Sequence, residues 1–221
     1  MFKSIAIDGP AGAGKSYISD IIAKKLGFLH VDTGAMYRTV AVYFDDNNID
    51  FENEQLVSEE MNNISIDIRF ASGKQIMILN DKDVSNRLRS AKISEISLKI
   101  SPFKCVRDFL LSLQRNIATK YNVVMDGRDI SSVVLPNADV KIFLTASVEE
   151  RANRRMKQLE DKGEKCDYDQ ILNSIKIRDH SDLTRKNAPL VVSDDAIFCD
   201  STDKTIDEVV EFLMNKIKKV I

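Results

Sequence analysis

A phosphate-binding loop near the start of the chain constrains the fold more than any other stretch. The residues Gly9, Pro10, Ala11, Gly12, Ala13, Gly14, Lys15 and Ser16 match each fixed position of the pattern, which is Gly, four variable residues, Gly, Lys and then Ser or Thr. A strand-like segment, residues 3–8, precedes the loop, and apolar residues spaced three and four apart follow it as far as Leu26. A strand, this loop and a helix in that order predict an α/β fold that binds a nucleoside triphosphate.

The residue types of the loop suit a bound phosphate chain. Glycines permit backbone angles and a close approach that side chains would block, so the loop amides are expected to face phosphate oxygens at the positive end of the helix. Lys15 is predicted to reach the outer phosphates, and the Ser16 hydroxyl is a predicted Mg²⁺ ligand. A chance match is much less favoured, because strand, loop and helix all fall in register.

Composition places the chain among globular α/β proteins. With 221 residues, of which 43% are hydrophobic, it can bury a core, and its length suits one domain with insertions. A net charge of −2 favours neither nucleic acid nor an anionic membrane as a general partner. Cys105, Cys166 and Cys199 lack metal-site spacing, residues 1–8 lack a signal-peptide core, and no apolar run approaches a membrane span. We therefore expect a cytoplasmic protein.

Four further buried strands are predicted, at residues 28–31, 122–125, 141–145 and 196–199. In an open parallel sheet, ligands bind at the carboxyl ends of the strands. Asp32 and Thr33 follow the first of these strands and suit the cap of a helix. Arg38 lies one turn into that helix, where it would face either a bound anion or solvent. His30 is interpreted as a strand residue without a further role.

Adjacent opposite charges follow the second of these strands. Gly127 places Arg128 and Asp129 beyond the strand's carboxyl end, at the crevice that Lys15 is expected to face. A buried strand that leads into such a pair is more specific than a charge pair on the surface. We therefore predict that Arg128 and Asp129 contact a ligand.

A small antiparallel hairpin is predicted within the parallel chain. Residues 64–70 alternate apolar and polar side chains, Ser72 and Gly73 form a turn, and residues 75–79 form the partner strand. Such an insert would either cover or select a second ligand, or stabilise the fold without contacting the substrate. Residues 85–119 are predicted to be helical.

Arginines gather on a later helix. This helix follows a predicted capping box at residues 147–150 and carries Arg151, Arg154 and Arg155, whose spacing predicts one shared face. Residues 160–165 are charged and suit a hinge. Beside a phosphate site this segment would form a lid, and the alternative is a solvated helix face with ion pairs four residues apart.

Arginines also occur at several strand and helix ends, namely Arg38, Arg107, Arg128, Arg178 and Arg185. Arg178 and Arg185 bracket Asp182, an arrangement that would be costly to desolvate without an anionic ligand. Arginine binds phosphate bidentately and stays ionised, so the set predicts phosphoryl transfer from a triphosphate to a second phosphate. Such an acceptor is already ionised near neutral pH, so that positioning and charge neutralisation would carry catalysis without a general base.

Together, these motifs closely resemble those of bacterial cytidylate kinases. The resemblance rests on residues 9–16, 32–38, 126–129 and 178–189, and it covers nearly the whole chain. It implies a three-layer P-loop kinase fold with a five-stranded parallel sheet flanked by helices. The single domain would comprise a core (about 1–60, 100–147 and 185–221), a small antiparallel insert for the acceptor nucleotide (about 61–99) and a helical lid (about 148–170). The resemblance further implies transfer of the ATP γ-phosphate to CMP or dCMP with Mg²⁺, by a monomer.

The resemblance also assigns site residues. ATP would contact residues 9–16, Tyr17, Arg154 and Arg155, with Ser16 on the Mg²⁺ ion. CMP would contact Thr33, Arg38, Ser97, Arg107, Arg128, Asp129, Arg178, Asp182 and Arg185. Among these, Arg38 and Arg128 would hold the acceptor phosphate, Arg107 and Asp129 would read cytosine, and Arg178 and Asp182 would contact the sugar and phosphates. The catalytic residues would be Lys15, Arg128, Arg178 and Arg185.

Two positions depart from the family's pattern. Thr33 stands where the family often has Ser, which keeps the hydroxyl and adds a methyl group near the pyrimidine. Leu98 occupies the position of a base-contacting Ser. Either the neighbouring Ser97 takes over that contact, or cytosine loses it.

Two other functions stay open at this point. One is a different P-loop kinase, for example for AMP, UMP or shikimate, which a substrate panel would distinguish. The other is a non-catalytic nucleotide sensor, which would bind ATP without transferring phosphate. The intact Lys15, Ser16 and arginine set argues against a sensor.

Overall fold

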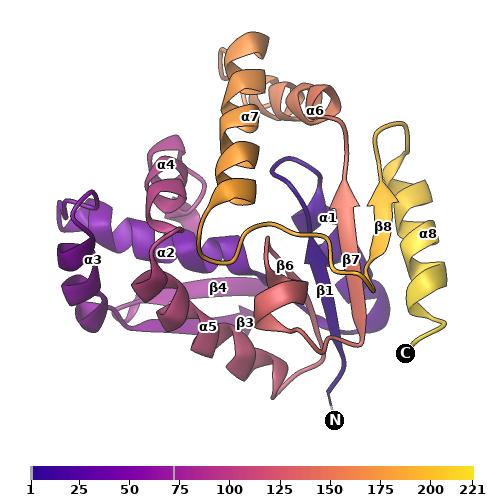
Figure 1. Ribbon diagram of the computed structural model, residues 1–221, viewed down its shortest axis with the longest axis horizontal. Coiled ribbons are helices and arrows are strands. Elements are labelled where there is room, and N and C mark those ends of the chain that lie inside the picture. Colours follow the sequence, from indigo (N-terminus) through magenta and orange to yellow (C-terminus); the bar gives the residue numbers. More distant parts are fainter. Residues whose placement is uncertain (1, 72) are drawn as a thin grey trace.

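A five-stranded parallel sheet forms the centre of the computed structural model, which describes residues 2–71 and 73–221. Its strands are β1 (Ser4–Asp8), β2 (Leu29–Asp32), β6 (Val123–Asp126), β7 (Val140–Thr145) and β8 (Ile197–Asp200), and their order is β2-β6-β1-β7-β8. The parallel strands that the sequence predicts are confirmed. Because neighbouring strands run in the same direction, their carboxyl ends meet along one edge of the sheet (Figure 1).

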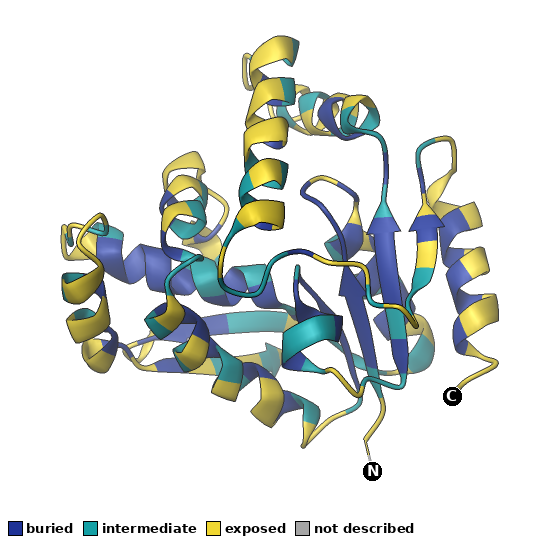
Figure 2. Ribbon diagram, viewed as in Figure 1, coloured by how far each residue is buried: buried dark blue, intermediate teal, exposed yellow. Residues whose placement is uncertain are grey.

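Helices cover both faces of the sheet and complete three layers (Figure 1). On one face, α1 (Lys15–Leu26) and α8 (Ile206–Ile217) pack with Ile5 and Ile7 of β1. On the other, α2 (Thr33–Asp46) and α5 (Lys104–Ala118) pack with Ala6. Neighbouring β1 residues enter different cores because side chains alternate across a strand. Figure 2 shows the central strands β1, β6 and β7 and the inward helix faces as mostly buried.

The chain between α2 and α5 carries the predicted antiparallel insert. Its elements are α3 (Glu54–Glu60), the 3₁₀ turn Met61–Asn63, β3 (Ile66–Ala71), β4 (Lys74–Leu79), β5 (Lys82–Asp83), the 3₁₀ turn Ser85–Arg87 and α4 (Ala91–Ile100). β3 and β4 pair in antiparallel register, and β5 adds a short third strand. Gly73 lies in the predicted turn with φ of 73°, while Ser72 lies outside the described residues.

The insert contacts the ligand-binding edge of the sheet through Gln75. The Gln75 side-chain oxygen accepts a hydrogen bond from the backbone amide of Asp32 (2.8 Å), and its amide nitrogen donates to the Asp32 carbonyl (3.3 Å). Asp32 ends β2 and caps α2, as predicted, by accepting from the backbone amide of Ala35 (3.0 Å). The insert therefore meets the core at the carboxyl end of β2, an edge strand of the sheet.

Two helices, α6 (Val148–Glu160) and α7 (Tyr168–Thr184), form a helical arm beyond that edge (Figure 1). They pack on each other around a small apolar cluster of their own, which includes Ala152, Ile171 and Ile175. The predicted lid, residues 148–170, takes in α6 and only the start of α7, whereas the arm continues to Thr184. None of the helices in residues 2–71 and 73–221 combines the length and apolar character needed to cross a membrane.

Of two helix capping boxes, one is complete, and the one predicted from the sequence is only half formed. Thr205 and Glu208 form the reciprocal capping box of α8. At residues 147–150 the box is only half formed, because Ser147 accepts from the Glu150 amide but the Glu150 carboxylate turns to Arg154 (2.8 Å). The ion pair four residues along the helix therefore replaces the second capping bond.

Candidate active site

A cavity of about 240 Å³ opens at the carboxyl edge of the sheet. Segments far apart in the sequence line it, including the phosphate loop, the start of α2, the end of α4, the turn after β6, and α7. All nine predicted acceptor contacts are in its wall, namely Thr33, Arg38, Ser97, Arg107, Arg128, Asp129, Arg178, Asp182 and Arg185. Lys15 and Ser16 line the same cavity, which therefore joins the predicted donor and acceptor sides.

The phosphate loop requires glycine at two positions in particular. At Gly9 a Cβ atom would lie 1.9 Å from the Leu144 carbonyl oxygen, and Gly14, which begins α1, has φ of 88°. Lys15 follows with a buried side chain whose Nζ donates to the Pro10 carbonyl (2.8 Å). Burial and the nearby charge of Arg128 hold the pKa of Lys15 well below its usual value. The ammonium group is thus placed where a polyanion would stabilise it.

A chain of hydrogen bonds runs from Ser16 through Asp126 to His30. Asp126 accepts from the Ser16 hydroxyl on Oδ2 (2.7 Å) and from His30 Nε2 on Oδ1 (2.7 Å). Burial favours the neutral acid, but the bonds from His30 and Ser16 hold the pKa of Asp126 below its usual value. Burial would also lower the pKa of His30, but the Asp126 carboxylate raises it. Neither His30 nor Asp126 has a role that the sequence alone predicts.

Three arginines concentrate positive charge over the phosphate loop. Arg38 pairs with Asp32 (2.8 Å), and Arg128 pairs with Asp182 (2.7 Å). Arg178 forms no ion pair within the described part of the chain, and its buried Nε has no hydrogen-bond partner there. Removal from water, followed by repulsion from Arg128, lowers the pKa of Arg178 to about 10. The charges of Asp182 and Asp179 offset this only in part, so the incompletely neutralised charge of Arg178 favours a bound anion.

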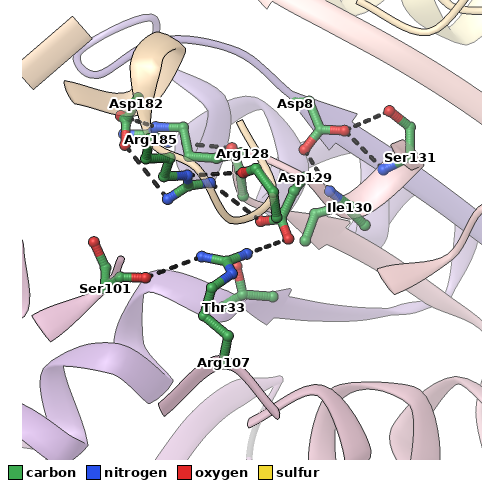
Figure 3. A network of polar contacts seen from close by, with 12 residues as sticks. Asp8, Thr33, Ser101, Arg107, Arg128, Asp129, Ile130, Ser131, Asp182 and Arg185 are labelled. Atoms are coloured by element: carbon green, nitrogen blue, oxygen red, sulfur yellow. Dashed lines mark hydrogen bonds and ion pairs between the residues drawn. The ribbon is translucent and has the colours of Figure 1, made fainter. Parts of the chain in front are cut away.

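Asp129 joins two further arginines in the cavity wall (Figure 3). Its Oδ2 accepts from Arg107, and its Oδ1 lies 3.6 Å from Nη2 of Arg185. Arg107 also donates to the Ser101 carbonyl (3.2 Å), and the Tyr37 ring lies 5.6 Å from its guanidinium carbon. Burial would lower the pKa of Arg107, but the charges of Tyr37 and Asp129 raise it. Arg107 and Asp129 therefore form a buried pair, in which the guanidinium group is the donor and the carboxylate is the acceptor.

Asp8, at the end of β1, fixes the turn that carries Asp129. Its carboxylate accepts from the backbone amides of Ile130 (2.8 Å) and Ser131 (2.7 Å) and from the Ser131 hydroxyl (2.6 Å), as Figure 3 shows. These bonds hold the start of the π-helical turn Ile130–Val134. Burial raises the pKa of Asp8 in spite of them. The strand that leads into the phosphate loop thus also positions the acceptor side, a link that local sequence patterns do not contain.

The structure adds detail at the two positions that depart from the family's pattern. Thr33 donates its hydroxyl to the Asp126 carbonyl (2.7 Å), so this hydroxyl is engaged by the backbone. Ser97 and Leu98 both line the cavity, and so does Ser101, which the sequence analysis missed. Ser101 lies closer along the chain to Arg107, so a search for serines near that arginine would have found it.

The arginines of α6 do not share one face, and that expectation was wrong. Arg151 is buried against the phosphate loop, where it donates to the Ala11 carbonyl (3.0 Å) and pairs with Asp179 of α7 (2.7 Å). Arg154 turns to Glu150 and to the Ser201 carbonyl (2.6 Å), and Arg155 is exposed. Tyr17 is likewise 58% exposed. None of Tyr17, Arg154 and Arg155 is among the residues that line the cavity.

Comparisons with known sequences agree with one another. A sequence profile described as cytidylate kinase matches residues 5–219. A cytidylate kinase of Caldicellulosiruptor saccharolyticus is 46% identical over 218 residues, which cover 99% of this chain and 96% of that protein. A cytidylate kinase of Fusobacterium nucleatum is 47% identical over 216 residues, which cover 98% of this chain and 97% of that protein.

Solved structures show the same architecture at much lower identity. An uncharacterized protein from Eubacterium ventriosum has a TM-score of 0.55 at 12% identity, covering 98% of each chain. A gluconokinase from Sinorhizobium meliloti has a TM-score of 0.51 at 12% identity, covering 98% of this chain and 92% of that one. At such identity the likeness shows the fold alone.

Proposed function

The chain belongs to the cytidylate kinase family, and from this premise we propose that it transfers the γ-phosphate of ATP to CMP or dCMP, giving ADP and CDP or dCDP. One observation carries the proposal. A single cavity joins the phosphate loop to a cluster of arginines whose charge is incompletely neutralised. Two anionic ligands would therefore meet there head to head.

On the donor side, Lys15 and the loop amides would hold the ATP phosphates. The hydroxyl of Ser16 and the carboxylate of Asp126 lie 2.7 Å apart, and they are the hard oxygen donors that Mg²⁺ prefers. Both residues therefore fit a Mg²⁺ ion bound with the triphosphate, which would neutralise charge on the β- and γ-phosphates. Residues 9–17, Arg154 and Arg155 stay predicted ATP contacts. Arg151 would support them by holding the loop at the Ala11 carbonyl.

On the acceptor side, Arg38, Arg128 and Arg178 would hold the CMP phosphate. A phosphate monoester is largely ionised near pH 7, because its second pKa is about 6. No general base is then needed, and the guanidinium groups, with Arg185, would neutralise the charge of the transferred group. Asp182, which orients Arg128 and Arg185, would also contact the sugar.

Arg107 and Asp129 would read the cytosine ring. A guanidinium donates to the ring carbonyl and ring nitrogen, whereas an ionised carboxylate only accepts and therefore suits the exocyclic amine. In the ligand-free protein these two groups bond to each other and face the cavity as a pair. Thr33 and Ser97 stay predicted contacts of the base.

The direct test is ADP release from ATP across a panel of nucleoside monophosphates. We expect CMP and dCMP to be phosphorylated at least about a hundredfold more efficiently than UMP or AMP. Uracil would offer the buried Asp129 carboxylate a carbonyl in place of an amine, and adenine has no ring carbonyl to accept from Arg107. Equal rates with AMP or UMP would favour the alternative of another P-loop kinase. Tight ATP binding without transfer to any acceptor would favour a nucleotide sensor.

Arg151 provides a second test, specific to the donor side. Arg151→Gln is expected to raise the KM for ATP about tenfold, since hydrogen bonds and ion pairs of a charged group contribute about 1.5–3 kcal/mol each. The KM for CMP should stay within about threefold. Lys157→Gln, on the exposed side of the same helix, is the matched control and should change neither constant. Equal losses for both substrates would show that Arg151 only supports the fold.

Three broader features belong to the same proposal. The helical arm would close over the bound phosphates as a lid, supported by the contact of Arg151 with the phosphate loop. The enzyme would act as a monomer. It would work in the cytoplasm, which is consistent with free thiols at Cys105, Cys166 and Cys199.

A further inference from the structure

His30 is a partly buried polar residue of β2, and its ring has a specific partner. β2 and β6 run parallel, with His30 opposite Val124 and Asp32 opposite Asp126. The imidazole therefore reaches forward along β6, and its Nε2 lies 2.7 Å from Oδ1 of Asp126. The His30 side chain is only 16% exposed and is not among the residues that line the cavity. The direct link from His30 to the cavity is its hydrogen bond to Asp126.

The Asp126 carboxylate is held from both sides. An ionised carboxylate only accepts hydrogen bonds, so the Nε2 atom of His30 carries the proton in this contact. One carboxylate oxygen takes this bond, which leaves the other free to accept from the Ser16 hydroxyl. The Asp126 side chain is 5% exposed, so water does not readily replace a lost donor. Without His30, the carboxylate would turn toward other donors and release Ser16.

The orientation of this carboxylate matters because of its place beside the phosphate loop. Ser16 and Asp126 lie in the cavity wall, where the proposed function places the Mg²⁺ ion of the nucleotide. Groups that orient a metal ligand from behind typically change metal affinity or activity about 10–100-fold when they are removed. His30 has this position, because it contacts Asp126 and does not itself line the cavity.

We propose that His30 is a positioning residue of the metal–nucleotide site, which holds the Asp126 carboxylate in the orientation that pairs it with the Ser16 hydroxyl. The inference rests on the proposed function, because it concerns the Mg²⁺ complex of ATP. It assigns to this chain a residue outside the cavity that sets how strongly ATP binding depends on Mg²⁺.

The test compares ATP affinity with excess Mg²⁺ and with EDTA, measured by calorimetry without CMP so that no turnover occurs. His30→Leu is expected to weaken binding about tenfold with Mg²⁺ and less than about threefold in EDTA. His30→Gln keeps an amide N–H near the position of Nε2 and should stay within about threefold of the wild type in both conditions. If His30→Leu does not fold, His30→Asn replaces it, because its shorter amide stops short of Asp126.

Equal weakening with and without Mg²⁺ would overturn the inference, and so would a glutamine variant as impaired as the leucine one. A lower melting temperature with an unchanged Mg²⁺ dependence would assign His30 to fold stability alone and would also overturn it. ATP binding by the wild-type protein distinguishes failure of this inference from failure of the proposed function. If it fails to bind ATP at all, the proposed function is wrong, whatever the variants do.

Discussion

Arg178→Met is expected to stabilise the ligand-free enzyme while it lowers kcat/KM for CMP by about two to three orders of magnitude. Arg178 forms no ion pair among the described residues, and burial together with Arg128 outweighs the charges of Asp182 and Asp179 and lowers its pKa to about 10. A lowered pKa in a base means that the folded protein disfavours the charged form, so removal of the charge relieves the ligand-free state. With acceptor phosphate present, the same charge becomes favourable and its loss harms catalysis.

The measurements are the melting temperature without ligands and steady-state kinetics with CMP and ATP. Relief of about 1 kcal/mol would raise the melting temperature by about 2–4 °C in a domain of this size. Lys176→Met is the matched control, because Lys176 is exposed on the same helix and should leave both quantities nearly unchanged. A lower melting temperature, or kcat/KM within tenfold of the wild type, would contradict the assignment of Arg178 to an anion site.

Asp129→Asn is expected to raise the KM for CMP about a hundredfold and to reduce the preference for CMP over UMP. The carboxylate accepts from Arg107 and lies near Arg185, and the amine of cytosine would be a further donor to it. Loss of two hydrogen bonds to a charged group corresponds to about 3 kcal/mol, or roughly a hundredfold. The asparagine side chain has an amide N–H that donates hydrogen bonds. The variant would therefore bind uracil, which has a carbonyl where cytosine has its amine.

ATP affinity is the companion measurement for this variant and should stay within about threefold, because Asp129 does not contact the phosphate loop. The sequence alone predicts the same contrast for Asp129→Ala. In the structure, however, that change would also leave Arg107 and Arg185 buried and uncompensated, which lowers stability. Asp108→Asn, at an exposed position of α5, is the control. Equal losses for CMP and ATP would contradict the base-reading role.

Much of the fold could be predicted from local patterns. The phosphate loop, the alternation at residues 64–70 and the apolar runs of the five parallel strands each depend on neighbouring residues alone, and each is confirmed. Convergence of Arg38 and Arg128 on one cavity was also predictable, because parallel strands place their carboxyl ends together. Arg178 reaches the same cavity from α7, and only the resemblance to the family predicted that. What failed was the direction of long side chains on a helix.

Arg151 and Arg155 illustrate that failure. Their spacing places them on neighbouring turns of one helix face, yet one is buried at the phosphate loop and the other is exposed. The partners of Arg151 are Ala11 and Asp179, which belong to distant segments. A periodic pattern predicts the direction of a Cβ atom. The position of a flexible guanidinium group depends on its hydrogen-bond and ion-pair partners, which the pattern does not contain.

The sequence by itself determined the binding loop, the order of strands and helices along the chain, and the types of side chain available for two phosphates and a base. Only the tertiary structure decided how those groups pair, as in the bonds of Asp8 to Ser131 and of His30 to Asp126. The physical reason is that a buried polar group must find its partner wherever the chain brings one within hydrogen-bond distance. Such partners lie on neighbouring strands or loops, and local periodicity carries no record of them.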